Sequence, residues 1–161
     1  MNYEGYTDNT LYLSVGGKDP VKVDKDGCFP IAVSDNGKNF FYRNSDDKLY
    51  YYNGKDSEKI ETNVSGTFFV NSTVSELLFD KNGKTYYYTP KMKEPLKVAG
   101  DSIDDLVQPG GAETRSNPLC YTYTGQAYVF GVDSFKGGVF TADGYLYWLN
   151  DKGTDAVKIV N

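Results

Sequence analysis

A short aromatic phrase recurs along this chain, and each copy is followed by a second apolar segment. The four copies of the phrase are Leu11–Leu13, Leu49–Tyr52, Tyr86–Tyr88 and Leu146–Trp148. The segments that follow them are Val21–Val23, Lys59–Ile60, Leu96–Val98 and Val157–Ile159. Self-similarity at a spacing of a few tens of residues is typical of a repeat architecture. The aromatic residues therefore belong to the scaffold, and the sequence says more about construction than about chemistry.

The composition indicates an all-β chain. The 161 residues include 15 Tyr, 9 Phe and 17 Gly. Tyr, Phe, Val and Thr favour pleated surfaces, whereas Gly, Asn and Asp supply turns. No stretch of ten or more residues has a helical period. We predict a single all-β domain over residues 1–161, long enough to bury about 70% of its unfolded surface.

The second repeat shows the unit most clearly. Strands are predicted at 49–52, 58–61, 64–70 and 77–79, with turns at Asn53-Gly54 and Asn82-Gly83. Asn-Gly between apolar runs is a strong hairpin signal, because both residues tolerate positive φ. The same pattern predicts strands at 11–14, 21–23, 29–33, 40–42, 86–88, 96–98, 103–107, 119–123, 127–130, 138–141, 145–149 and 156–160. The four units cover approximately residues 9–45, 46–83, 84–125 and 126–161, the last compressed.

Consecutive aromatic residues indicate how the units pack. Tyr50, Tyr51 and Tyr52 are adjacent, as are Tyr86, Tyr87 and Tyr88. Side chains alternate faces along a strand, so each run places bulk on both faces of its sheet. Sheets stacked face to face would bury both sides. We therefore predict β-propeller-like tandem four-stranded antiparallel blades, about four of them, with an irregular β-sandwich as the alternative.

Four units are barely enough to close a propeller into a ring. Propellers need about four to eight blades, and an incomplete row leaves two blade faces uncovered. We expect either a piece of a larger propeller or two chains that cover each other's open ends, which gel filtration with light scattering would test.

The sequence pattern of Asp46–Ile60, followed by that of Asp80–Tyr88, resembles TolB-like propeller repeats, in particular those of uncharacterised surface-anchored proteins of Gram-positive bacteria. The likeness covers residues 11 to about 98 well and the rest loosely. It implies a propeller fold, export behind an N-terminal anchor, and a binding or structural role. Residues 109–118 and the short last unit depart from the pattern.

Histidine is absent, which removes the usual base of Ser-His-Asp and Cys-His catalysis and the commonest zinc ligand. A glycosidase needs only carboxylates. The candidates would be Glu58, Glu61, Glu76, Glu94 and Glu113, most of them in lysine-rich segments typical of solvated ion pairs. The acidic clusters at 24–27 and 101–105 match no complete calcium loop and are better explained as turns. We predict no catalytic residue, no metal and no cofactor.

Charge and hydropathy narrow the partners and the compartment. The net charge is −5 and the two arginines, Arg43 and Arg115, lie far apart, so nucleic acid is not an expected ligand. No run of 18 apolar residues spans a membrane. Cys28 and Cys120 read as buried thiols, with a disulfide as the alternative. The N-terminus is not a secretory signal, so the chain is either cytoplasmic or taken from behind an export segment; we expect the cell surface.

The insertion from Pro109 to Pro118 is the expected site of ligand contact, because long loops on rigid scaffolds commonly carry binding. It holds Glu113 and Arg115; a disordered connector is the alternative. Trp148 is expected in the core. The predicted function is a non-enzymatic module for protein–protein interaction at the bacterial cell surface. Carbohydrate or cell-wall binding through exposed aromatics is the alternative, and a carboxylate-dependent glycosidase is a third.

Overall fold

The computed structural model describes residues 10–26, 29–64, 67–107, 114–116 and 127–159, and every regular element among them is a β-strand. The strands are β1 (Leu11–Leu13), β2 (Val21–Asp24), β3 (Phe29–Val33), β4 (Phe40–Arg43), β5 (Leu49–Tyr52), β6 (Ser57–Glu61), β7 (Phe68–Val70), β8 (Leu77–Lys81), β9 (Lys84–Tyr88), β10 (Leu96–Ala99), β11 (Ile103–Val107), β12 (Thr114–Ser116), β13 (Ala127–Phe130), β14 (Val139–Ala142), β15 (Tyr145–Leu149) and β16 (Ala156–Ile159). The all-β prediction is confirmed for this part of the chain. Cys28 and Cys120 lie outside the described residues.

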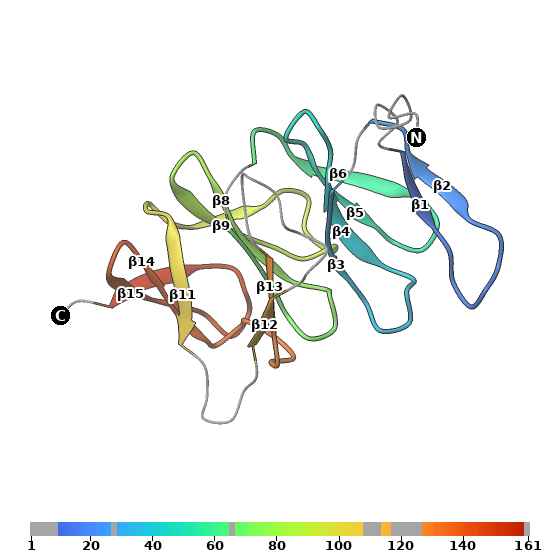
Figure 1. Cartoon of the computed structure of the whole chain (residues 1–161). Helices are drawn as coiled ribbons and strands as arrows, with labels where there is room; N and C mark the ends of the chain where they lie inside the picture. The colour runs from blue at the N-terminus through green and yellow to red at the C-terminus, as the bar shows by residue number, and fades with distance from the viewer. Residues whose placement is uncertain (1–9, 27–28, 65–66, 108–113, 117–126, 160–161) are drawn as a thin grey trace.

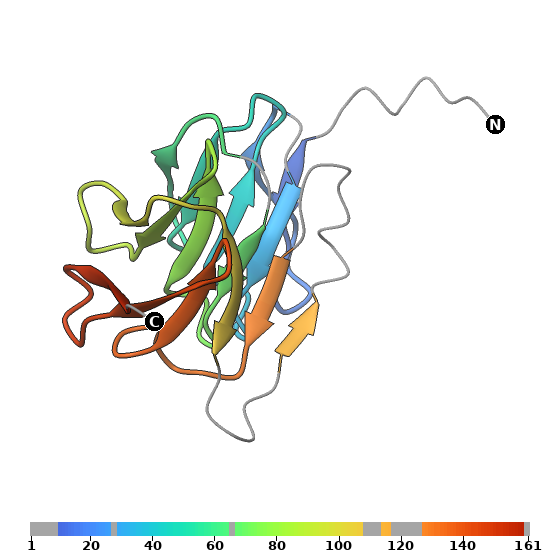
Figure 2. The ribbon, with the colours of Figure 1, turned by 90° about the vertical axis from the view of Figure 1, so that its left-hand side faces the viewer.

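The strands form four sheets that follow one another along the chain. Their orders are β1-β2, β3-β4-β5-β6, β10-β9-β8-β7-β13-β12 and β11-β14-β15-β16. Figure 1 shows the sheets as a row, with β1-β2 at one end and β14-β15 at the other, and Figure 2 looks along this row from the β14-β15 end. We call them the first to the fourth sheet in this order. The row is open, because the first and the fourth sheet lie at opposite ends of it (Figure 1).

The predicted units and the observed sheets are out of phase by two strands. The second sheet takes β3 and β4 from the first unit, and β5 and β6 from the second. Within the sheet all neighbours are antiparallel, as predicted. The hydrophobic pattern thus located the strands, while pairing across the unit boundary decides which of them share a sheet.

The predicted long loop is partly a strand. Residues 114–116 form β12, which pairs antiparallel with β13. In turn β13 pairs in parallel with β7, so the stretch that interrupts the fourth sheet extends the third one. This correction has a physical reason: the β7 edge would otherwise leave backbone donors and acceptors unpaired. The other residues of the predicted loop that lie between 108 and 113 or beyond 116 fall outside the described residues.

Consecutive tyrosines bury both faces of the second sheet. Tyr51 and Leu49 lie in a cluster with residues of the third sheet, whereas Tyr52 lies against Leu11 and Leu13 of the first. Tyr51 is 8% exposed and Tyr52 is 6% exposed. The predicted two-sided burial of this run is confirmed.

The third sheet is covered in the same way. Tyr88 belongs to the cluster with the second sheet, and Tyr87 to the cluster with Phe140 and Leu149 of the fourth. Across the first of these junctions the rings of Tyr88 and Phe41 meet edge to face, with centroids 6.4 Å apart. Such aromatic pairs add about 0.5–1.5 kcal/mol beyond their buried area.

Two-residue turns set the register of the hairpins. Asn82 and Gly83 have φ of 53° and 73°, and Asp143 and Gly144 have φ of 48° and 76°. Positive φ at both central residues is the type I′ arrangement that matches the twist of the flanking strands. The turn predicted at Asn82-Gly83 is therefore confirmed in residue and in conformation, and Asp143-Gly144 forms a turn of the same kind.

Candidate functional site

The β7–β8 connection is a polar loop held by one buried side chain. The Oδ1 atom of Asn71 accepts hydrogen bonds from the backbone N–H groups of Ser75 and Glu76, both at 2.8 Å. Its Nδ2 atom donates to the Asp133 carbonyl at 2.7 Å. An asparagine side chain can replace backbone partners in this way, which favours tight turns. Asn71 thus shapes the loop and attaches it to the segment after β13.

Val74 adopts a rare conformation at the tip of the loop. Its φ of 56° lies in the left-handed region, which β-branched residues seldom occupy. The residue is 2% exposed and packs in the cluster between the second and third sheets. Its carbonyl accepts a hydrogen bond from Asn39 Nδ2 of the β3–β4 connection at 2.9 Å. Packing on one side and Asn39 on the other hold the backbone in this position.

Glu76 is the buried carboxylate of the site, 6% exposed. Its Oε1 atom accepts hydrogen bonds from the hydroxyls of Tyr87 and Ser134 and from the backbone N–H of Phe135; the Ser134 bond is 3.0 Å long and the Phe135 bond 3.2 Å. Its Oε2 atom lies 3.4 Å from Asn71 Nδ2. A buried carboxylate needs such donors to offset its lost hydration. Glu76 therefore joins β8, β9 and the β13–β14 connection.

Burial raises the pKa of the Tyr87 hydroxyl well above its ordinary value, and the hydrogen bond to Glu76 and the negative charge of that carboxylate raise it further. The phenol stays protonated and acts as a donor to Glu76. It is fully enclosed, at 0% exposed, so it has no access to a substrate. The hydrogen bond between Tyr87 and Glu76 therefore stabilises the fold, and the two groups are not an acid–base pair.

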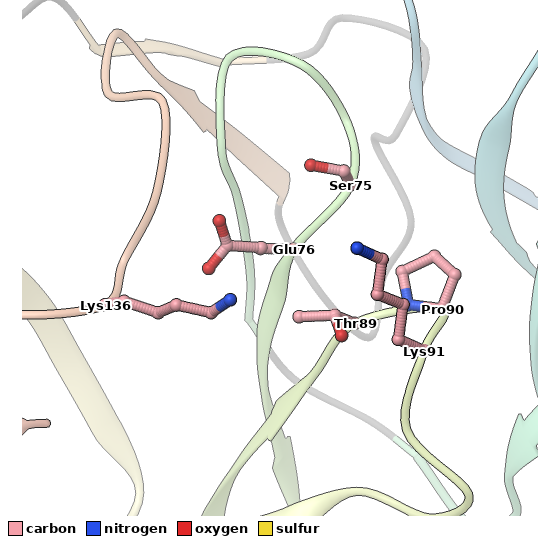
Figure 3. A pocket seen from close by; sticks show the side chains of 6 residues that line it. All are labelled: Ser75, Glu76, Thr89, Pro90, Lys91 and Lys136. Carbon is pink, nitrogen blue, oxygen red and sulfur yellow. The ribbon is translucent and has the colours of Figure 1, made fainter. Parts of the chain in front are cut away.

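A hollow of about 290 Å³ opens beside Glu76. Its lining residues are Ser75, Glu76, Thr89, Pro90, Lys91 and Lys136. Figure 3 shows Lys136 and Lys91 on either side of Glu76 and Thr89, one from the β13–β14 connection and one from the segment after β9. Among the described residues no carboxylate lies within ion-pair distance of either ammonium group. The rim of the hollow is therefore cationic.

The hollow can accommodate a small anionic group. The volume is close to the lower end of the range for small-molecule pockets, about 300 Å³. Two exposed lysines can attract an anionic group, while Glu76 already accepts several hydrogen bonds. Sequence reasoning placed Glu76 among solvated residues and did not single out Lys91 or Lys136. The signal available was the polar run Asn71–Glu76 between two buried strands.

Of the two residues predicted to contact a ligand, only Arg115 is among the described residues. Arg115 is the central residue of β12 and pairs with Val129 of β13. Glu113 lies outside the described residues.

The other glutamates proposed for glycosidase chemistry do not join Glu76. Glu58 and Glu61 are on β6, Glu94 is exposed before β10, and none of the three lines the hollow. Glu61 forms an ion pair with Lys81 at 2.7 Å, as expected for these lysine-rich segments. Glycoside hydrolysis commonly uses two carboxyl groups about 5–10 Å apart across the substrate. The hollow supplies one, and that one is fastened to its donors.

The hydrogen bonds support the predicted turn role for the first acidic cluster only; in the second cluster Asp104 and Asp105 lie on β11, and Asp101 and Asp104 bind groups distant in sequence. Asp24 Oδ1 accepts from the Asp26 N–H at 3.0 Å, and Asp104 Oδ2 accepts from the Gly144 N–H at 2.8 Å. Asp101 Oδ2 accepts from the Tyr147 hydroxyl at 3.2 Å. Within the described ranges no group of three or more His, Cys, Asp or Glu side chains is arranged to hold a metal ion.

Trp148 is not in the core. Its side chain is 36% exposed on the outer face of the fourth sheet, so the expectation of burial was wrong. Along β15 the side chains of Tyr147 and Leu149 on one face are buried, but among the described strands no further sheet covers the face of Trp148 (Figure 1).

No helix long and apolar enough to cross a membrane occurs in the described part of the chain. No protein-family model and no curated protein sequence matches the chain.

Proposed function

We propose that this protein is a non-enzymatic binding and assembly module of the bacterial cell surface, built from propeller-like blades of the TolB-like kind. Supporting the blade assignment are four successive sheets that bury consecutive tyrosines on opposite faces. A sandwich of two sheets would have one inner and one outer face per sheet. The second and third sheets each have two inner faces.

The observation that carries the binding role is the cationic hollow. Lys91 and Lys136 flank Glu76 without an ion-pair partner among the described residues, and the fixed loop beneath them keeps the site in shape. A protein partner that presents an Asp or Glu side chain fits this rim. Its carboxylate would lie between the ammonium groups, away from Glu76.

A peptide array tests this role. The probes are peptides of equal length that differ in Asp and Glu content, read at low and at moderate salt. Two exposed charges near a surface contribute on the order of 1 kcal/mol together, so the Lys91→Ala/Lys136→Ala variant should bind acidic peptides about fivefold more weakly. Binding should also weaken with added salt.

The matched control is Lys55→Ala/Lys84→Ala, which removes two exposed lysines, one from the β5–β6 turn and one from the start of β9. Equal losses in both double variants would mean nonspecific charge attraction. Unchanged binding in the Lys91/Lys136 variant would reject the hollow as the site. Labelling of intact against lysed source cells checks the compartment, and signal confined to lysed cells would reject a surface role.

Carbohydrate binding is a second candidate because Trp148 offers an exposed ring. A glycan array with the wild type and with Trp148→Ala separates the two functions. Binding that depends on Trp148 and not on the lysines would favour the carbohydrate role.

A further inference from the structure

One position of the repeat points along the row, toward the side on which the following sheet lies. It is occupied by Leu13, Tyr51, Tyr87 and Trp148 in β1, β5, β9 and β15. The first three lie in clusters with residues of the following sheet. Trp148 occupies the same position in the last sheet and is 36% exposed. It is the side chain that a following sheet would cover.

The preceding position always faces the previous sheet, and it is tyrosine each time. The residues are Tyr12, Tyr50, Tyr86 and Tyr147. The last three pack in clusters with residues of the preceding sheet. Tyr12 belongs to the first sheet and is 55% exposed. The same sheet-to-sheet junction occurs three times within the row. At the two ends of the row, the two faces that would form a further junction are both uncovered.

One row of side chains on the outer face of the fourth sheet is apolar from edge to edge. Register aligns Val107, Val139, Trp148 and Val157 in one row across its four strands. The next row holds Leu146 and Ile159 together with the polar Asp105 and Thr141. We call the six apolar residues of these two rows the Trp148 face; Val107 and Val157 are each 51% exposed and Ile159 is 40% exposed. A contiguous apolar surface of this kind marks an interaction site.

We propose that the Trp148 face of one copy binds the first sheet of a second copy, on the side that carries Tyr12 and Lys22. At each internal junction, the repeat position that faces the following sheet packs on the face that the following sheet turns back toward it. The two ends of the row leave one face of each kind uncovered. Lys22 is the register partner of Tyr12 on the first sheet, and Asp105 lies in the same row as Leu146 on the fourth. The two faces therefore carry side chains of opposite charge. Because the faces lie at opposite ends of the molecule, the contact is head to tail (Figure 1).

Sedimentation velocity from about 1 to about 200 µM tests the proposal, since association must depend on concentration. The wild type should associate, and Trp148→Glu and Tyr12→Glu should each reduce the protein to monomers. Val33→Glu is the control, because Val33 is 39% exposed but lies on β3 in the second sheet. A wild type that stays monomeric throughout overturns the proposal.

Mixing the two single variants identifies the partner face. The Trp148→Glu chain keeps its first sheet and the Tyr12→Glu chain keeps its Trp148 face, so the mixture should form one-to-one heterodimers and stop there. If Tyr12→Glu still associates like the wild type, the Trp148 face pairs with itself and the head-to-tail contact is wrong. Failure of the mixture to associate overturns it as well.

Val157→Glu, on the same face at β16, replaces Trp148→Glu should the latter fail to fold, as judged by circular dichroism. The inference rests on the repeated sheet packing proposed above and not on the hollow. The Lys91→Ala/Lys136→Ala variant should therefore associate like the wild type. The two proposals can then fail independently, because peptide binding tests the hollow and association tests the Trp148 face.

Discussion

Tyr88 illustrates what enclosure between two sheets does to an ionisable side chain. It is 4% exposed, at the junction of the second and third sheets. Burial raises the pKa of its hydroxyl to about 12, with smaller contributions from the negative charge of Glu58 and from Tyr51. The ordinary value of 10.0 applies to the unfolded chain. Folding therefore favours the neutral phenol.

This shift predicts a loss of stability at high pH. Below pH 10 the phenol is neutral in both states, and its contribution is fully present. Above pH 10 the unfolded chain ionises first, so stability falls by about 1.4 kcal/mol per pH unit until the folded group ionises near pH 12. The total loss from this residue is about 3 kcal/mol.

Urea unfolding between pH 8 and pH 12 measures the effect, and Tyr88→Phe should give the flatter profile of the two proteins. Tyr12→Phe, at an exposed tyrosine, controls for removing one hydroxyl. A Tyr88→Phe profile parallel to the wild type would contradict the assignment.

Hairpin turns and strand pairs show how far sequence reasoning reaches. Aromatic runs and Asn-Gly or Asp-Gly pairs located β5, β9 and β15 and their turns, because local chemistry determines both. The strand β12 (Thr114–Ser116) has no hydrophobic alternation, so nothing local indicated it. Its pairing with β13, and that of β13 with β7, depends on contacts distant in sequence.

The candidate site was less accessible to prediction for the same reason. Glu76 looks like other glutamates near lysines until Tyr87, Ser134 and Phe135 are brought to it in space. Charge and spacing in the sequence describe the carboxylate but not its donors. Sequence reasoning did identify the absence of histidine, and with it the classes of chemistry that need one.

Two turn glycines separate backbone strain from steric crowding. Gly144 and Gly153 have φ of 76° and 66°, so alanine is strained at either position. A Cβ atom on Gly144 meets nothing within 4 Å, whereas one on Gly153 lies 3.0 Å from Tyr87 Cε1 and 3.1 Å from Lys136 Cε. The Tyr87 ring is held by Glu76 and has no room to move.

We expect Gly144→Ala to cost about 1 kcal/mol of unfolding free energy and Gly153→Ala about 2–4 kcal/mol. Chemical denaturation of both variants measures the difference. Equal losses would show that the Tyr87 ring gives way and that the hydrogen bond to Glu76 is weaker than its geometry indicates.

The molecule as a whole is a row of sheets whose stability comes from the faces between them. Tyr51 lies inside a junction and Trp148 lies on the open end, although both occupy the same position of the repeat. Truncating a buried aromatic side chain removes contacts from both sheets and leaves a cavity. Truncating an exposed one removes little from the monomer.

At low micromolar concentration Tyr51→Ala should therefore lower the unfolding free energy by about 3–5 kcal/mol, and Trp148→Ala by about 1 kcal/mol or less. Thermal and urea unfolding of the two variants provide the comparison. A loss at Trp148 as large as that at Tyr51 would mean that the end sheet depends on its outer face even in the monomer.

The parallel pairing of β13 with β7 also governs the order in which the chain can mature. The second sheet has all its strands once residue 61 is available, but the third gains its full width only after residue 130. During synthesis the Phe68–Val70 segment must wait for a stretch made later, with its edge unsatisfied in the meantime. A strand that is synthesised later, β13, therefore completes a sheet that was begun earlier, and it ties residues 127–130 to the middle of the polypeptide.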